Sequence, residues 1–209
     1  MEQKEKEKLL ILARRAKEAD DAHNAKKYYE ELMLEDPNDW EAVFYAQYYT
    51  FFSSKVIQAP TQANLMRKAA KNAVNVICDS EMSLDEKVAA VKVLENDMFE
   101  FWQHVNSCLV GMSVMDFDEK QSARCSAFAI LYDVGDILEE KLSASKEINE
   151  ICVKFWKEAV LNTISTYDFY YAAKFGEIAR QHIPMITKYD PAYLPPEKKV
   201  EKKSGGCLG

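Results

Sequence analysis

Glycine and proline are scarce in this chain, with six of each among 209 residues. Turn-rich β folds use many such residues, so their scarcity favours long helices. No apolar run approaches the ~20 residues that a membrane-spanning helix needs. The first eight residues, MEQKEKEK, are highly charged and contain no apolar signal-peptide segment. We therefore expect a cytoplasmic protein with no membrane partner.

An excess of positive charge is also missing. The chain has 27 Lys and Arg residues against 34 Asp and Glu residues, a formal net charge of −7. Binding to a phosphate backbone needs a positive face, and this net field repels it. No block of Lys and Arg is interleaved with aromatic residues. We therefore expect no nucleic-acid partner.

Paired cysteines and closely spaced metal ligands are absent as patterns. The five cysteines are widely spread, and an odd number without paired spacing is a poor disulfide framework. Four of them stand beside apolar residues at helical positions, which is typical of small buried side chains in a reducing compartment. These are Cys78, Cys108, Cys125 and Cys152.

Signatures of catalysis are missing as well. There is no Cys-x-x-Cys or His-x-x-x-His pair, and no glycine loop that would cradle a phosphate. Glu95, Glu100 and His104 share one expected helix, but a di-metal bundle needs Glu and His three residues apart on two helices. Glu100 and His104 are four apart, with no second copy. We expect no metal, no cofactor and no enzymatic activity.

What the sequence contains is helical periodicity, enough for about eight helices in one all-α domain spanning residues 1–193. The first expected helix runs from about Lys6 to Ala19, and the second ends at Asp36-Pro37. Asn38 and Glu41 form a possible capping box for a third, Ser83 and Glu86 for a fifth, and Asp116 and Glu119 for a sixth. The fourth begins near Pro60, the seventh contains Ile148–Val160, and the eighth contains Ala172–Ile186 with Pro184 kinking or shortening it.

Two features within these helices carry further expectations. The third helix has seven aromatic residues around its circumference, which favours burial between two neighbours over an exposed aromatic face. Gly135 lies inside the periodic pattern of the sixth, where a close helix crossing would explain it. Residues 194–209, with Pro195-Pro196 and EKKVEKK, read as a disordered polar tail.

The first expected hairpin resembles a tetratricopeptide repeat (TPR), a 34-residue pair of antiparallel helices. Counting back from Pro37, Ala13 and Ala25 fall at the small positions where the two helices cross, and Tyr29 falls at the aromatic position. Small residues let helix axes approach closely. Asp20 stands where the family usually has glycine, and Lys71 stands where proline should close a second repeat. A faint second match near the C-terminus is carried by Ala179 and Pro191.

More broadly, the pattern resembles bacterial proteins in which such a helical region stands beside a zinc ribbon or a C-terminal cysteine-containing box. The segment Ser204-Gly205-Gly206-Cys207 is similar to the opening of such a box. Cys207 is third from the end of the sequence, whereas prenylation requires the fourth position.

The resemblance implies a TPR-like superhelix, or a compact bundle, that holds a protein or peptide partner. Some family members grip a partner's C-terminal carboxylate with Lys and Asn on successive repeats, but the first-repeat positions here are Leu10 and Arg14. Arg14 and Lys17 remain, either as contacts for an acidic partner or as solvated surface residues. The possible partner-binding residues are Arg14, Lys17, Tyr45, Tyr48 and Tyr49.

Three functions remain open at this point. The first is a non-catalytic protein–protein interaction scaffold, with affinity from a few aromatic anchors. The second is a helical bundle with a small-molecule or enzymatic pocket among its Tyr, Trp and Cys residues. The third is a structural homo-oligomer in which the fifth and sixth helices pair between chains.

Overall fold

The protein is all-helical, as its periodicity predicts. A computed structural model describes residues 3–109, 115–164 and 169–196. Within them lie eight α-helices, one short 3-10 helix and no strand. Their bounds are α1 Gln3–Glu18, α2 Ala22–Glu35, α3 Trp40–Ser53, η1 Val56–Gln58, α4 Ala59–Asp79, α5 Leu84–Leu109, α6 Phe117–Leu142, α7 Lys146–Ile164 and α8 Phe169–Tyr189.

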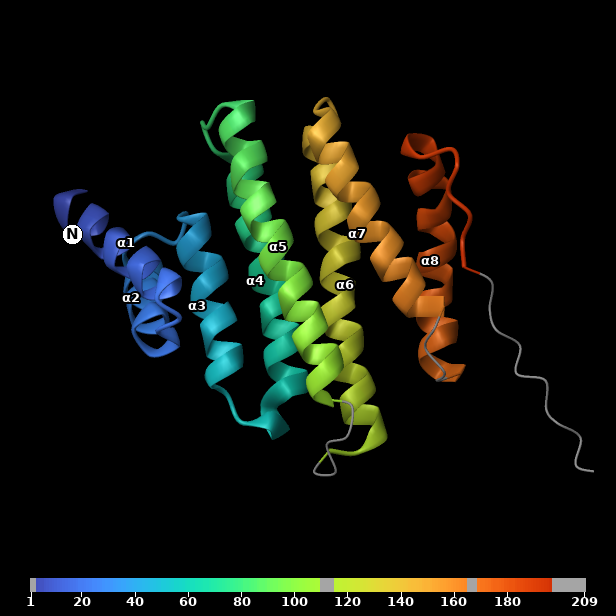
Figure 1. Cartoon of the computed structure of the whole chain (residues 1–209), viewed down its shortest axis with the longest axis horizontal. Helices are drawn as coiled ribbons and strands as arrows, with labels where there is room; N and C mark the ends of the chain where they lie inside the picture. Colours follow the sequence, from blue (N-terminus) through green and yellow to red (C-terminus); the bar gives the residue numbers. More distant parts are fainter. Residues whose placement is uncertain (1–2, 110–114, 165–168, 197–209) are drawn as a thin grey trace, which may run out of the picture.

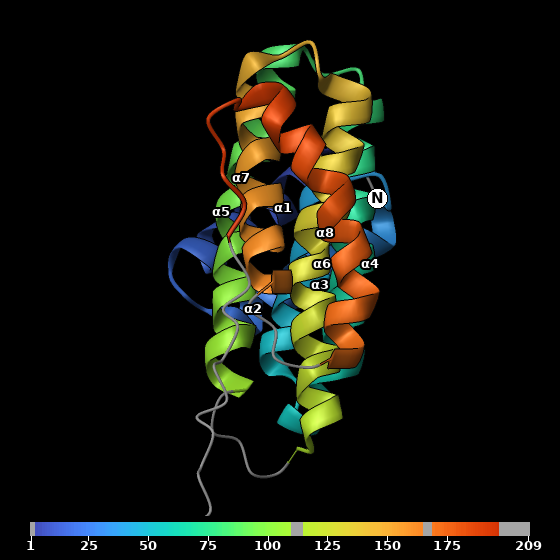
Figure 2. The same cartoon turned by 90° about the vertical axis from the view of Figure 1, so that its right-hand side faces the viewer.

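The helices stand side by side in an array that begins with α1 and α2 and ends with α8 (Figure 1). Seen from its C-terminal end, the array has two layers, with α5 and α7 on one side and α4, α6 and α8 on the other (Figure 2). Neighbours in sequence pack together from α1 to α4 and from α6 to α8. Short connections make such neighbours antiparallel.

One pairing departs from this order. α4 packs closely against both α3 and α6, whereas α5 packs mainly against α6 and only lightly against α4. α4 and α6 therefore join the two ends of the array, and α5 covers them from the other layer (Figure 2).

The first hairpin turns at a left-handed residue. Asp20 has φ of 53°, and the Asp20 and Asp21 amides donate to the carbonyls of Lys17 (3.1 Å) and Ala16 (2.9 Å). This is the Schellman pattern, in which the left-handed position favours glycine. Ala13 and Ala25, expected at the helix crossing, are both completely buried.

The start of α3 differs from the sequence-based expectation by one residue. Asp39, not Asn38, is the N-cap, and its side chain accepts a hydrogen bond from the Ala42 amide at 3.1 Å. Glu41 therefore does not take the capping role we expected and is buried instead. The other two expected boxes are confirmed, with Ser83 and Glu86 before α5 and with Asp116 and Glu119 at α6.

Five of the seven aromatic residues of α3 are in the core, as the preferred alternative predicted, whereas Trp40 and Phe52 are partly exposed. Phe44, Tyr45, Tyr48, Tyr49 and Phe51 are all less than a tenth exposed. Their rings contact one another, and Phe51 also meets Phe101 of α5 with ring centroids 4.7 Å apart.

Gly135 marks the close crossing expected for α6. A Cβ atom at this position would lie 2.5 Å from Nε1 of Trp156 on α7, and Trp156 is fully buried. At the other expected irregularity, Pro184 lies inside α8, which continues to Tyr189.

The described residues contain no helix with the length and apolarity to cross a membrane. Gly111, which the sequence predicts as the C-terminal cap of the fifth helix, lies outside the described residues, as do residues 197–209 with the Ser204–Cys207 segment.

Candidate functional site

An open groove of about 670 Å³ lies between α1, α3 and the start of α5. These are the first helices of three successive hairpins, the elements that face the same side of a hairpin array. The apolar lining comes from Trp40, Tyr45, Met82, Ala89, Ala90 and Val93. The ionisable lining consists of Arg14, Lys17, Glu18, Glu41 and Glu86, together with the phenol of Tyr29 on α2.

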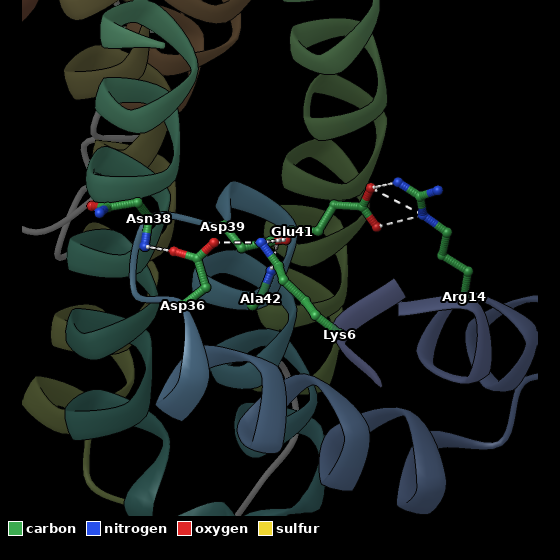
Figure 3. Close-up of polar contacts among 7 residues, drawn as sticks. All are labelled: Lys6, Arg14, Asp36, Asn38, Asp39, Glu41 and Ala42. Carbon is green, nitrogen blue, oxygen red and sulfur yellow. Dashed lines mark hydrogen bonds and ion pairs between the residues drawn. The ribbon is translucent and has the colours of Figure 1, made fainter. Parts of the chain in front are cut away.

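Arg14 of α1 is bound to Glu41 of α3 (Figure 3). Its Nε lies 3.1 and 3.0 Å from the two carboxylate oxygens, and its terminal Nη2 also donates to Oε1. The Glu41 side chain is 10% exposed, whereas that of Arg14 is 54% exposed. Because a buried carboxylate needs a cation, this pair fixes α1 against α3 and neutralises one wall of the groove.

Lys17 joins three helices at one end of the groove. Its Nζ donates to Asp97 of α5 at 2.9 Å and to the hydroxyl of Tyr45 on α3, and it lies 3.9 Å from the centre of the Tyr45 ring. Burial, followed by the Asp97 charge, raises the pKa of Tyr45. Its phenol therefore stays protonated and donates to Asp97. We call this contact of Lys17, Tyr45 and Asp97 the three-helix joint.

A further ion pair fixes the beginning of α1. Lys6 binds Asp36 in the turn between α2 and α3 and lies 3.7 Å from Asp39, while the Asn38 amide donates to Asp36 at 2.9 Å (Figure 3). The hydrogen bond between Lys6 and Asp36 lowers the pKa of the Asp36 carboxyl and raises the pKa of the Lys6 ammonium. The Ala25–Ala13 crossing is therefore supported by polar contacts along the whole of α1.

The hydroxyl of Tyr29 is the unusual polar group of this site. Tyr29 is completely buried, and its hydroxyl is inaccessible and has no hydrogen-bond partner among the described residues. Its ring stacks with that of Tyr49, with centroids 6.2 Å apart, which holds the phenol in place. A buried hydroxyl without a partner costs about 1–3 kcal/mol, so its place beside a groove is notable for binding.

The structure brings three of the five expected partner-binding residues together. Arg14, Lys17 and Tyr45 line the groove, although both cations already bind carboxylates of the chain. Tyr48 and Tyr49 do not line it and pack in the aromatic core at 8% and 9% exposure.

Sequence reasoning missed several residues of the groove and its surroundings. Asp97, which binds Lys17, is 80 positions away from it, and no local pattern signals that contact. Met82, Val93 and Glu18 were not identified as candidates, although all three line the groove and Val93 is 44% exposed. Glu86 was expected only as part of a capping box.

A second polar cluster lies at the other end of the array. His182 of α8 places Nε2 2.8 Å from Asp136 Oδ1 and Nδ1 2.7 Å from the Ile178 carbonyl, and Trp156 Nε1 donates to the same Asp136 oxygen at 3.0 Å. Burial lowers the pKa of His182, but the bonds to Asp136 and Ile178 outweigh it and raise that pKa overall. We call this the histidine clasp. It ties α6, α7 and α8 together.

The histidine clasp has no activated nucleophile beside it among the described residues. Burial raises the pKa of Cys152 to about 12 and that of Cys78 to about 11, so both thiols stay protonated. No three His, Cys, Asp or Glu side chains of the described residues gather in a way that would hold a metal ion. Glu95 is instead paired with Lys154 at 2.8 Å.

A second, smaller groove of about 460 Å³ lies between α7 and the segment after α8. Its lining includes Phe99, Lys157, Leu161 and Tyr193, and Lys157 binds Asp190. The first groove is larger and joins three helices, so it is the stronger candidate for a binding site.

Comparison of the chain with protein-family models, with curated proteins and with solved structures finds no match.

Proposed function

We propose that this protein is an interaction module that binds a peptide segment of a partner protein in the groove between α1, α3 and α5. The observation that carries the proposal is the groove itself, about 670 Å³ in volume and formed by the first helices of three successive hairpins. The TPR resemblance of the first hairpin supports it, because such arrays hold partners on the face made by these helices.

The composition of the groove suits recognition. Trp40, Met82 and Val93 offer apolar contacts beside charged side chains, and aromatic and methionine residues are common where partners are held. Its ion pairs fix α1 against α3 and α5 before any partner arrives, which lowers the ordering cost of binding.

The histidine clasp, in contrast, supports no reaction. Its Asp136 and His182 are hydrogen bonded to each other and to Trp156 and Ile178, and no reactive group of the described residues completes a catalytic set. We therefore assign it a structural role and propose that the protein acts without catalysis.

A peptide selection with the full chain tests the proposed site. The immobilised protein is exposed to a phage-displayed library of random peptides about 12 residues long, and the selected peptides are measured in solution. Val93→Gln removes an apolar contact in the groove, and Val56→Gln is the matched control at 40% exposure outside it. We expect Val93→Gln to weaken binding at least about tenfold and Val56→Gln less than about twofold.

Equal binding to the wild type and to Val93→Gln would show that the selected peptides use another surface. Recovery of no binding peptide would also count against the proposal. A circular dichroism melt of each variant separates loss of binding from loss of fold.

A further inference from the structure

The cations of the groove are already used. Arg14 is paired with Glu41, and Lys17 is paired with Asp97 and Tyr45. Each positive charge is therefore already compensated by a carboxylate, so an acidic partner would meet the negative charge of Glu41 or Asp97 beside each cation. A partner that took Arg14 away from Glu41 would leave that carboxylate buried without its cation, which is costly.

The remaining charges in the groove are negative. The lining contains two cations, Arg14 and Lys17, and three carboxylates, Glu18, Glu41 and Glu86. Once Arg14 is paired with Glu41 and Lys17 with Asp97, Glu18 and Glu86 remain. Both are exposed, and no cation of the described residues lies within ion-pair distance of either.

Glu86 keeps its charge at neutral pH. Its carboxylate accepts hydrogen bonds from the Ser83 amide at 2.8 Å and from the Ser83 hydroxyl at 2.7 Å, and these lower its pKa. The donors are neutral, so the negative charge on Glu86 is left uncompensated. Glu18, the last residue of α1, contributes a second negative charge.

A second observation points to a ligand independently of charge. Tyr29 lines the same groove, is completely buried, and has a hydroxyl without a hydrogen-bond partner among the described residues. Buried hydroxyls are almost always paired in folded proteins. The hydroxyl is inaccessible in the free protein, so a side chain of the groove must move aside before a polar atom of a bound segment can supply the missing partner.

We infer that the occupant of this groove is a basic amphipathic segment of a partner protein. Its apolar side chains lie on Trp40, Met82 and Val93, its Lys or Arg side chains pair with Glu18 and Glu86, and one polar atom binds the Tyr29 hydroxyl. The inference rests on the proposed function and adds the sign of the partner's charge, which is opposite to the acidic partner that Arg14 and Lys17 suggest from sequence. The net charge of −7 favours the same partner at long range.

The peptide selection tests this charge directly. We expect the selected peptides to contain an excess of Lys and Arg over Asp and Glu, with apolar residues between them. The most enriched peptide is then synthesised with a fluorescein label, and its affinity for the full chain is measured by fluorescence anisotropy.

The test variant is Glu18→Gln/Glu86→Gln. Glutamine in place of Glu86 still fits the capping box with Ser83. The matched control is Glu31→Gln/Glu140→Gln, which changes the net charge equally at exposed positions on α2 and α6. We expect the test variant to weaken binding about threefold to tenfold and the control less than about twofold. Raising NaCl from about 50 to 300 mM should weaken wild-type binding and leave the test variant less affected.

Selected peptides that are acidic or neutral, yet lose affinity with Val93→Gln, would overturn the basic partner and keep the proposed function. Equal loss in the test and control variants would also overturn it. Peptides that are insensitive to Val93→Gln would overturn both the basic partner and the groove as the binding site.

Discussion

The two ends of the array are held together by different kinds of contact. At the N-terminal end, α1 and α2 pack together with Ala13 and Ala25 buried, and partly exposed ion pairs connect α1 to α3 and α5 beside a groove. At the C-terminal end, α6, α7 and α8 share a cluster of hydrogen bonds around His182, Trp156 and Asp136. The first arrangement borders the larger groove, whereas the second surrounds the buried His182 and Trp156 and leaves Asp136 half-exposed. The groove proposed for binding and the histidine clasp therefore lie at opposite ends of one fold.

The largest effect is expected at the closest crossing of the C-terminal end. Gly135→Ala places a Cβ 2.5 Å from Nε1 of the fully buried Trp156, so the ring must move away from Asp136. We expect the free energy of unfolding to fall by about 2–4 kcal/mol, more than offsetting the ~1 kcal/mol that alanine gains over glycine in a helix. Urea unfolding followed by tryptophan fluorescence measures it.

Gly176→Ala in α8 is the control, because nothing lies within 4 Å of a Cβ there. We expect it to raise stability by up to about 1 kcal/mol. If Gly135→Ala were as stable as the wild type, the crossing of α6 and α7 would be looser than described.

The next effect is expected at the N-terminal crossing. Ala25 is completely buried between α1 and α2, so Ala25→Leu overfills the crossing and should cost about 1–3 kcal/mol of unfolding free energy. The exposed Ala22→Leu, in the same helix, should change it by less than about 0.5 kcal/mol. Hydrogen exchange would localise the loss to α1 and α2. Equal stability of the two variants would contradict the alanine crossing.

The histidine clasp should make stability depend on pH. The pKa of His182 is higher in the folded protein than in the unfolded chain, where it is about 6.5. Protonated His182 therefore contributes fully to the free energy of unfolding below about pH 6.5, and this contribution is lost as the pH rises through the pKa of the folded state. Asp136 and Asp133 are the charges that raise it. We expect His182→Gln to cost about 1–2 kcal/mol at pH 6 and less at pH 9, measured by urea unfolding.

His23→Gln, at an exposed position in α2, should change stability by less than about 0.5 kcal/mol at either pH. A His182→Gln deficit that grew with rising pH would show that the ring is neutral in the folded protein.

The smallest effect sharpens the comparison most directly, because one atom is removed at each end. Tyr29→Phe deletes a hydroxyl without a partner among the described residues and should leave stability unchanged or raise it by up to about 1 kcal/mol. Tyr132→Phe deletes a hydroxyl bound to Thr163 at 3.0 Å and should cost about 1 kcal/mol. Thermal unfolding compares the two, and only Tyr29→Phe should weaken peptide binding. An equal cost for both would mean that the Tyr29 hydroxyl is paired after all.

Much of the fold was predictable because its causes are local. Helical periodicity predicted the all-α class. Asp36-Pro37 predicted the end of the second helix, and α2 ends at Glu35, directly before this pair. The capping pattern at Asp116 and Glu119 located the start of α6. At α3 the same logic chose Asn38 over Asp39, since both residues can cap and only the turn geometry distinguishes them.

The candidate site was predictable only in part, because its contacts join distant residues. Arg14 and Lys17 were identified as charged residues near the first hairpin, but their partners, Glu41 and Asp97, depend on how α3 and α5 pack. Tyr48 and Tyr49 were considered for binding because an aromatic helix has no visible inward face in sequence. Packing on both sides placed them in the core.

The three-helix joint has a consequence for how the fold divides into units. Lys17 meets Asp97 across 80 residues of sequence, and α5 supplies one whole wall of the groove. A single helical hairpin is a unit of chain architecture, but it has no binding surface of its own. The proposed binding surface is lined by residues of α1, α2, α3 and α5, so a change of partner preference would require changes in segments that a repeat boundary would separate.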